Sequence, residues 1–204
     1  MDLSIQKLTK AYNRKIIFHD LNFHVRSGSR FAITGPNGSG KSTLLKILSG
    51  GALASSGSIT YTTDNKAISA EDIFRYVHFV APYNTVIEEL SLAELFQLHQ
   101  RLGLLKQFQR FEDWSSLLDY TFIPSQQIKM FSSGMKQRVK LGLALLDNRS
   151  LIFLDEPGSN LDVQGKEWLA NLITGIESTK TIIIASNDPA EIRLCNETFD
   201  LLHH

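Results

Sequence analysis

The sequence predicts an α/β fold with a mainly parallel core sheet, an N-terminal antiparallel β subdomain and an inserted α-helical subdomain. Three observations lead to this prediction. Short apolar runs alternate with helical segments over much of the chain, as they do where helices cover a parallel sheet. Residues 2–8 and 15–26 instead alternate apolar and polar positions, as half-buried antiparallel strands do. Between about 88 and 147 helical patterns interrupt the alternation.

The length and composition indicate one globular domain over residues 1–204. We expect residues 1–87 and 148–204 to form the core with its β subdomain, and residues from about 88 to 147 to form the helical subdomain. A hydrophobic content of 43% with 21% charged residues argues against disorder. The 21 basic residues balance 21 acidic ones, so the basic excess of a nucleic-acid platform is missing. The single Cys195 excludes an intramolecular disulfide.

The chain shows no sequence pattern for membrane insertion. No apolar run reaches the ~18 to 20 residues that cross a bilayer. The first residues, Met-Asp-Leu-Ser-Ile-Gln-Lys, lack the charged start and apolar core of a signal peptide. We therefore expect a cytoplasmic protein that meets a membrane only through a partner.

Five strands and one helix are expected in the first 80 residues. Turn residues at Asn13-Arg14 and Ser27-Gly28 bound the second amphipathic strand. Glycines also mark the end of the one helix expected in this part. A short apolar run over 30–34 is typical of a strand buried on both faces. The strands are predicted at 2–8, 15–26, 30–34, 57–62 and 76–80, and the helix at 41–48, where leucines share one side.

The second half contains helices and two further buried strands. Ser91 and Glu94 form a capping-box pattern that starts a helix running to about residue 102. The mixed stretch 104–122 is also expected to be helical. Helical spacing continues over 133–146 and 162–176, and apolar runs predict strands at 151–154 and 181–185.

A glycine-rich loop joins the predicted strand 30–34 to the helix 41–48. It matches the phosphate-loop pattern in the strand–loop–helix context that supports it, which indicates a P-loop NTPase rather than a simple turn. Glycines let backbone N–H groups approach phosphate oxygens, and the helix adds its positive N-terminal end. Lys41 would bind the β- and γ-phosphates, and Ser42 would bind Mg²⁺. The residues expected to bind nucleotide are Gly35, Pro36, Asn37, Gly38, Ser39, Gly40, Lys41, Ser42 and Thr43.

Two carboxylates follow the predicted strand 151–154. Ligands of open α/β sheets bind at the carboxyl ends of the strands, where Asp155 and Glu156 are expected to lie. We assign Asp155 to Mg²⁺ and Glu156 to the general base that polarises an attacking water. A solvated strand end is the alternative, but the phosphate loop favours the functional interpretation.

Three further segments identify a family. Residues 131–138, Phe-Ser-Ser-Gly-Met-Lys-Gln-Arg, resemble the signature motif of ATP-binding-cassette (ABC) ATPases. Residues 155–162 resemble the acidic strand end and D-loop of that family, and residues 9–12 its adenine-stacking stretch. The resemblance covers nearly the whole chain in the family's order and is strongest to short bacterial cassette subunits of ABC transporters.

The resemblance implies an ATPase that uses ATP and Mg²⁺ and drives a separate transmembrane permease through head-to-tail dimerisation. The second cassette would be another copy or a related chain. The protein would lie peripherally at the inner face of the cell membrane and bind no nucleic acid. Tyr12 would stack on adenine, although an ordinary strand-end aromatic is the alternative. Ser132 and Gly134 would contact the γ-phosphate held by the other subunit, and Asp162 would couple the two sites.

The sequence departs from the family pattern at three places. In the signature, Ser133 and Met135 replace the usual glycine and glutamine, which we interpret as a tolerated variant. Pro82 stands where the family places a glutamine that senses Mg²⁺ and water. Proline offers no side-chain hydrogen bond, so either a neighbour such as Asn84 substitutes or that contact is absent. Asn187 stands in place of the switch histidine. Its amide can donate to a γ-phosphate oxygen but cannot ionise near neutral pH, so we expect catalysis through Asn187 to be slow.

Two other functions remain open from sequence. One is a non-transport cassette ATPase in repair or translation, which the neutral charge disfavours. The other is a module that dimerises on ATP without hydrolysing it. The helical subdomain and residues 79–90 would pass the motion to the permease. Within them, residues 86–90 are the candidates for the contact, with a plain loop leading into the next helix as the alternative.

Overall fold

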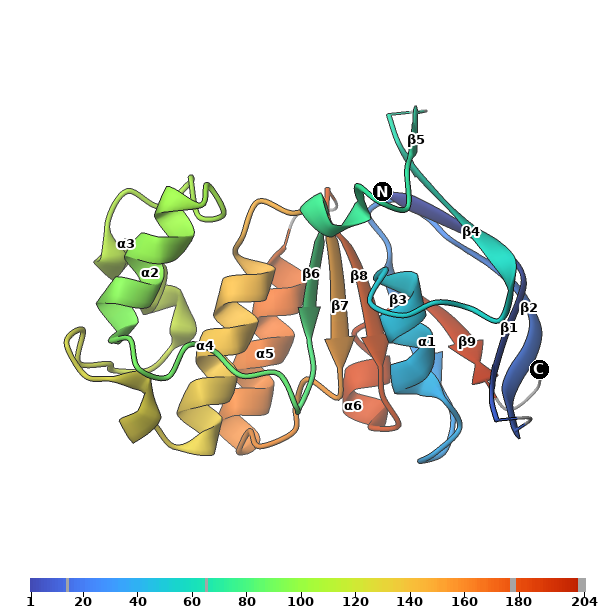
Figure 1. Ribbon diagram of the computed structural model, residues 1–204. Coiled ribbons are helices and arrows are strands. Elements are labelled where there is room, and N and C mark those ends of the chain that lie inside the picture. Colours follow the sequence, from blue (N-terminus) through green and yellow to red (C-terminus); the bar gives the residue numbers. More distant parts are fainter. Residues whose placement is uncertain (14, 65, 177–178, 202–204) are drawn as a thin grey trace. The chain divides into compact units, whose positions relative to one another are not determined.

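The computed structural model describes residues 1–13, 15–64, 66–176 and 179–201 (Figure 1). Arg14, half of one predicted turn, lies outside the described residues. By internal contacts the chain divides into two compact units. The first contains the described residues of Met1–Phe79, Arg149–Glu156 and Glu177–His204, and the second contains Val80–Asn148 and Pro157–Ile176.

An antiparallel sheet forms one layer of the first unit. Its strand order is β2-β1-β4-β5. The first two strands confirm the amphipathic hairpin predicted from alternation, but β5 was not predicted. The strands are β1 (Asp2–Tyr12), β2 (Lys15–Val25), β4 (Ser56–Thr63) and β5 (Lys66–Ile68).

A second sheet of five strands follows the order β6-β7-β8-β3-β9. The pairs β7–β8, β8–β3 and β3–β9 are parallel, which confirms the predicted α/β class. Every residue of β7 and β8 is buried, as continuous apolar runs require. The short strand β9 was not predicted. The strands are β3 (Arg30–Thr34), β6 (Val77–Val80), β7 (Leu151–Asp155), β8 (Thr181–Ala185) and β9 (Glu197–Asp200).

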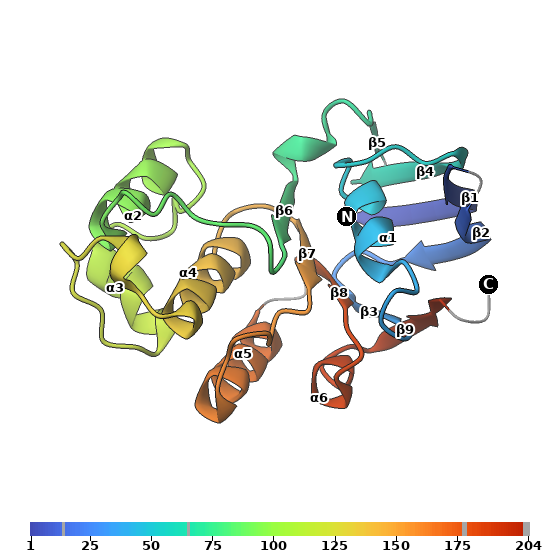
Figure 2. The same cartoon turned by 60° about the horizontal axis from the view of Figure 1, so that its bottom comes forward.

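The predicted helix α1 (Lys41–Leu48) contacts β7 and β8 of the parallel sheet (Figure 2). Leu44, Leu45 and Leu48 are fully buried in a core that also takes side chains from β1 and β2. One apolar core therefore holds α1, and with it the loop that precedes the helix, against both sheets. Two short helical segments complete the unit: α6 (Pro189–Ile192) and the 3₁₀ turn η1 (Ile73–Arg75).

The second unit is helical. Helix α2 begins with the predicted capping box, in which the Ser91 amide donates to Glu94 Oε2 at 2.7 Å and the Glu94 amide donates to Ser91 Oγ at 3.3 Å. Helices α4 and α5 lie side by side in both views (Figures 1 and 2). The mixed stretch 104–122 contains one short helix and one 3₁₀ turn. The elements are α2 (Leu92–Arg101), α3 (Phe111–Ser115), η2 (Ser116–Leu118), η3 (Ile128–Met130), α4 (Ser133–Leu145) and α5 (Val163–Gly175).

Within the described ranges, no helix is both long and apolar enough to cross a membrane.

Candidate functional site

The N-terminus of α1 is open toward the loop that precedes it. Helix α1 begins at Lys41 with Gly40 at the capping position, and no side chain caps it. Helices α2, α4 and α5 are each capped by a side-chain oxygen, from Ser91, Ser132 and Asp162 respectively. The first amides of α1 are therefore available to an anion, which the helix dipole also favours.

Two features show why this loop has its particular residues. Gly40 has a φ of +102°, and a Cβ there would lie 2.5 Å from Ile17 Cγ2, so a larger residue does not fit. The Lys41 side chain turns back over the loop and donates to the carbonyl oxygens of Gly35 at 2.7 Å and Pro36 at 3.1 Å. The ammonium group thus lies at the loop, where a phosphate would meet it.

The two predicted Mg²⁺ ligands are in contact. Ser42 Oγ donates to Asp155 Oδ1 at 3.0 Å across 113 positions of sequence. A hydroxyl and a carboxylate are the hard oxygen donors that Mg²⁺ takes when nucleotide phosphates and waters complete its shell. The described residues contain no cluster of three or more His, Cys, Asp or Glu that could hold a metal ion.

The two acids at the carboxyl end of β7, Asp155 and Glu156, lie in different surroundings. Burial is the largest effect on Asp155 and raises its pKa. The hydrogen bond from the Ser42 hydroxyl and the positive charge of Lys41 act in the opposite direction. Glu156 has a φ of +46°, uncommon outside glycine, and its amide donates to Ala185 O at 2.9 Å. This turn takes Glu156 out of the strand and into the wall of the phosphate-loop hollow. Strained backbone of this kind concentrates at functional sites.

The hollow around the loop has a volume of about 260 Å³. Sequence reasoning did not assign Ile17 of β2, which lines it; no local motif marks this residue. Tyr12 does not line the hollow: its ring is half exposed and lies 4.4 Å from Lys10 Nζ. The lining residues are Ile17, Asn37, Gly38, Gly40, Lys41, Ser42, Thr43 and Glu156.

Asn187, two residues beyond β8, reaches the same loop. Its Nδ2 donates to Asn37 Oδ1 at 3.0 Å, and both side chains are exposed. The structure therefore brings Asn187, Lys41, Ser42, Asp155 and Glu156 to one edge of the parallel sheet. That edge lies at the carboxyl ends of β3, β7 and β8, where ligands of such sheets bind.

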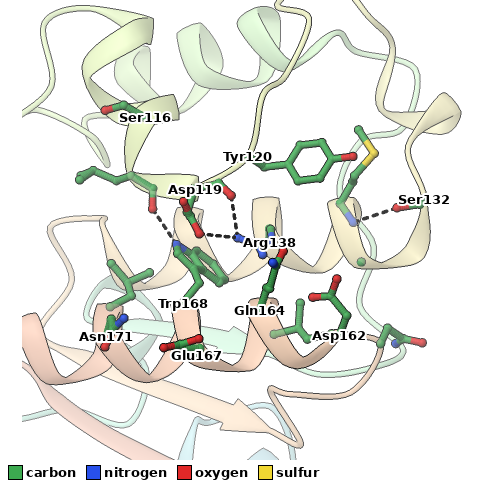
Figure 3. A pocket seen from close by; sticks show the side chains of 16 residues that line it. Ser116, Asp119, Tyr120, Ser132, Arg138, Asp162, Gln164, Glu167, Trp168 and Asn171 are labelled. Carbon is green, nitrogen blue, oxygen red and sulfur yellow. Dashed lines mark hydrogen bonds and ion pairs between the residues drawn. The ribbon is translucent and has the colours of Figure 1, made fainter.

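The second unit has a larger hollow, of about 1000 Å³, that brings together the predicted residues of the signature segment and of the segment before α5 (Figure 3). Ser132 caps α4 by accepting the Met135 amide at 3.2 Å, and Asp162 caps α5 by accepting the Gly165 amide at 2.7 Å. A Cβ on Gly134 would lie 3.1 Å from Asn160 O, so the start of α4 lies close to the loop before α5. Ser132, Gly134 and Asp162 all line this hollow.

The wall of the large hollow contains an arginine that sequence reasoning left without a role. The guanidinium of Arg138 donates to Leu118 O and Asp119 O, both at 3.0 Å, and lies 3.6 Å from Asp119 Oδ2 (Figure 3). It also lies 5.0 Å from the Trp168 ring and 6.0 Å from the Tyr120 ring. Arg138 thus joins α4, α5 and the 116–120 segment at one buried point.

We expect Arg138→Met to destabilise the protein by about 2–3 kcal/mol, because two carbonyl oxygens lose a charged donor in a buried place. The measurement is the free energy of unfolding from urea titration. Arg110→Met is the matched control, since the Arg110 side chain is 69% exposed and its pairing with Glu112 contributes little. Equal effects of the two substitutions would contradict this account of Arg138.

The segment with Pro82 lies elsewhere in the second unit. Pro82 and Asn84 line a cavity of about 150 Å³ together with Ser133 and Lys136 of α4. Pro82 itself is exposed at a turn in which the Asn84 amide donates to Ala81 O at 3.1 Å. Its ring offers no side-chain hydrogen bond, in agreement with the sequence.

Fold and site together define a P-loop ATPase cassette: a glycine-rich loop at the start of a helix, a serine–aspartate pair suited to Mg²⁺ and an adjoining glutamate. Comparison with known proteins gives the family. The sequence matches the ABC transporter family over residues 18–159. The chain belongs to this family, as an ATP-binding subunit with ATPase activity.

Individual relatives agree with this assignment. The lantibiotic transport ATP-binding protein SrtF of Streptococcus pyogenes is 30% identical over 196 residues, which cover 93% of this chain and 82% of SrtF. The lipoprotein-releasing system ATP-binding protein LolD of Treponema denticola is 30% identical over 203 residues, covering 90% and 88%. The ATP-binding cassette MJ0796, in a dimeric post-hydrolysis state with ADP and Pi, shares the fold at a TM-score of 0.81 and 21% identity, covering 97% of this chain and 93% of that one.

Proposed function

We propose that this chain hydrolyses ATP to drive a separate membrane permease. The contact between Ser42 and Asp155 beside Lys41 and Glu156 carries the proposal, because it assembles the chemical groups for phosphoryl transfer to water at one sheet edge. The localisation that follows is cytoplasmic, peripheral at the inner face of the cell membrane.

Each residue of the loop site has a proposed task. Lys41 and the free amides of α1 hold the phosphate oxygens, and Ser42 with Asp155 holds Mg²⁺, which supplies charge neutralisation when bound. Glu156 accepts a proton from the attacking water as general base. Tyr12 serves the adenine, and its exposed ring, flanked by Lys10, leaves one face available for stacking.

The large hollow of the second unit supports a dimer. Ser132, Gly134 and Asp162 line one surface although 28 positions separate Gly134 from Asp162 in sequence. We propose that this surface receives the γ-phosphate of ATP held by a second cassette, either another copy or a related chain, in a head-to-tail pair. The dimeric state of MJ0796 makes such a pair a reasonable expectation for this fold.

The cargo is expected to be recognised by the permease. The relatives named above serve lantibiotic transport in one case and lipoprotein release in the other, although both cassettes are equally similar to this chain. Similar cassettes thus serve chemically different cargoes, which is expected if the cassette supplies energy and another subunit selects.

We expect turnover to be slow because of Asn187. Its amide donates one of its two N–H groups to Asn37 Oδ1, which leaves one N–H for a phosphate oxygen. A neutral amide stabilises the charge of the transition state less than a histidine that can carry a proton.

Asn187→His should therefore raise kcat, by about 10- to 100-fold if one well-placed donor is restored. Phosphate release by the purified complex with its permease measures this. Asn196→His is the matched control because Asn196 lies away from the loop and accepts from the Arg30 amide. A wild-type complex with ordinary turnover that Asn187→His leaves unchanged would contradict the slow-ATPase proposal.

Affinity capture from detergent-solubilised source membranes, with ATP and Mg²⁺ present, tests the proposed function as a whole. We expect mass spectrometry to find a polytopic membrane protein in near-equal amount. Capture of soluble proteins or ribosomes alone would instead favour a non-transport cassette. If the wild type showed no more ATP turnover than the Glu156→Gln variant, a module that dimerises on ATP without hydrolysing it would be favoured.

A further inference from the structure

The side chains of residues 81–90, here called the proline loop, form an exposed outer row and a partly covered inner row. Pro82, Tyr83, Thr85, Ile87 and Glu89 are exposed, whereas the residues between them are partly covered. Tyr83 is 53% and Ile87 48% exposed, so the outer row presents large apolar side chains to the surroundings. The inner row, Asn84, Val86 and Glu88, lines the small cavity of about 150 Å³ together with residues of the signature helix α4, and Pro82 and Thr85 of the outer row reach the same cavity.

Two lysines of α4 meet the inner row. Lys140 Nζ donates to Asn84 O at 3.2 Å and to Ala81 O at 3.4 Å, and Lys136 Nζ forms an ion pair with Glu88 Oε2 at 2.7 Å. Lys136 and Lys140 are four residues apart, so they lie one above the other on one face of the helix. Both lysines also line the cavity that residues of the loop and of α4 share.

The surroundings of the two lysines show that these are more than surface contacts. Lys140 is half-buried, and burial lowers its pKa. The side chains of Lys136 and Glu88 are only 26% and 34% exposed, which reduces solvent screening of their pair. Gln137, between the lysines in sequence, donates to Pro157 O at 2.8 Å and fixes the same stretch of helix to the loop before α5.

We infer that Lys136 and Lys140 are positioning residues that fasten the proline loop to α4. A partner that binds the outer row through Tyr83 and Ile87 then acts on the helix that begins at Ser133 and carries the signature. The two lysines supply the connection for a loop whose Pro82 offers no side-chain hydrogen bond. The identity of the partner rests on the proposed function. The attachment of the proline loop to α4 by the two lysines does not depend on that function.

Amide hydrogen exchange of the isolated chain tests the fastening. In Lys140→Met, exchange of the proline loop should rise about tenfold, because a charged donor to two carbonyls is lost, while α2 should not change. Lys140→Arg should restore slow exchange, and Lys136→Met should reproduce the increase near Glu88. The matched control is Lys129→Met, an exposed lysine next to the loop. Unchanged exchange in Lys140→Met and Lys136→Met would overturn the inference.

ATP turnover of the membrane complex tests the mechanical role. Lys140→Met should lower kcat about tenfold with little change in the KM for ATP, since the lysine lies outside the nucleotide site, and Lys140→Arg should recover kcat. Faster loop exchange with unaltered kcat would overturn the transmission of force through Lys140. A wild-type complex without turnover would instead count against the proposed function, while the exchange result would still decide the fastening.

Discussion

Glu156→Gln should lower ATP turnover by at least about 100-fold while ATP binding persists. The amide has the size of the carboxylate but cannot accept a proton from water, and a positioned general base contributes a factor of that order or more. The substitution leaves the other groups at the loop, Lys41 and the Ser42–Asp155 pair, in place. Phosphate release at saturating ATP and Mg²⁺ gives kcat, and titration with a fluorescent ATP analogue gives affinity.

Glu71→Gln is the control for this change, because Glu71 is exposed and lies far along the chain from any loop-site residue. It should leave turnover unaltered. If Glu156→Gln retained wild-type kcat, the general base would have to be another residue and the assignment of Glu156 would fail.

Lys41→Met should weaken ATP binding by about 100-fold or more. Methionine keeps much of the length of lysine but removes the cation, and a charge-assisted hydrogen bond to phosphate contributes about 1.5–3 kcal/mol each. The variant also loses the donors to Gly35 O and Pro36 O, so the loop becomes less ordered before nucleotide arrives. Calorimetric titration with ATP and Mg²⁺ measures the effect.

Lys66→Met, an exposed lysine of β5, is the control and should change affinity little. The thermal unfolding midpoint of both variants should be recorded with the titrations. An ATP affinity of Lys41→Met equal to that of Lys66→Met would show that the phosphates do not meet this loop.

Local patterns in the sequence predicted most elements and the chemistry of the site. The helix Lys41–Leu48 has its predicted bounds, and the capping box at Ser91 and Glu94 forms as expected. The class of enzyme followed in the same way, from the loop around Lys41 and the segment around Gly134. These features depend on residues near one another in the chain, so a single sequence contains them.

Short elements without a strong period were missed. Strand β5 has three residues, and β9, Glu197–Asp200, has only one buried side chain, Phe199. Their pairing partners, β4 and β3, determine them more than their own composition does. The hairpin also departs from simple alternation: the β1–β2 register shifts near Leu8 and Lys10, and Ile16 is 60% exposed where alternation with Phe18 would cover it.

By itself, then, the sequence determined the α/β class, the order of elements and which residues have the chemistry for ATP. Only the tertiary structure decided that Ser42 meets Asp155, that Ile17 rather than Tyr12 lines the loop hollow, and that Lys140 lies beneath the proline loop. The reason is physical: helix periods and phosphate loops arise from neighbours in sequence. Contacts between distant side chains depend on strand register and helix packing, which form only when the whole chain has buried its apolar surface.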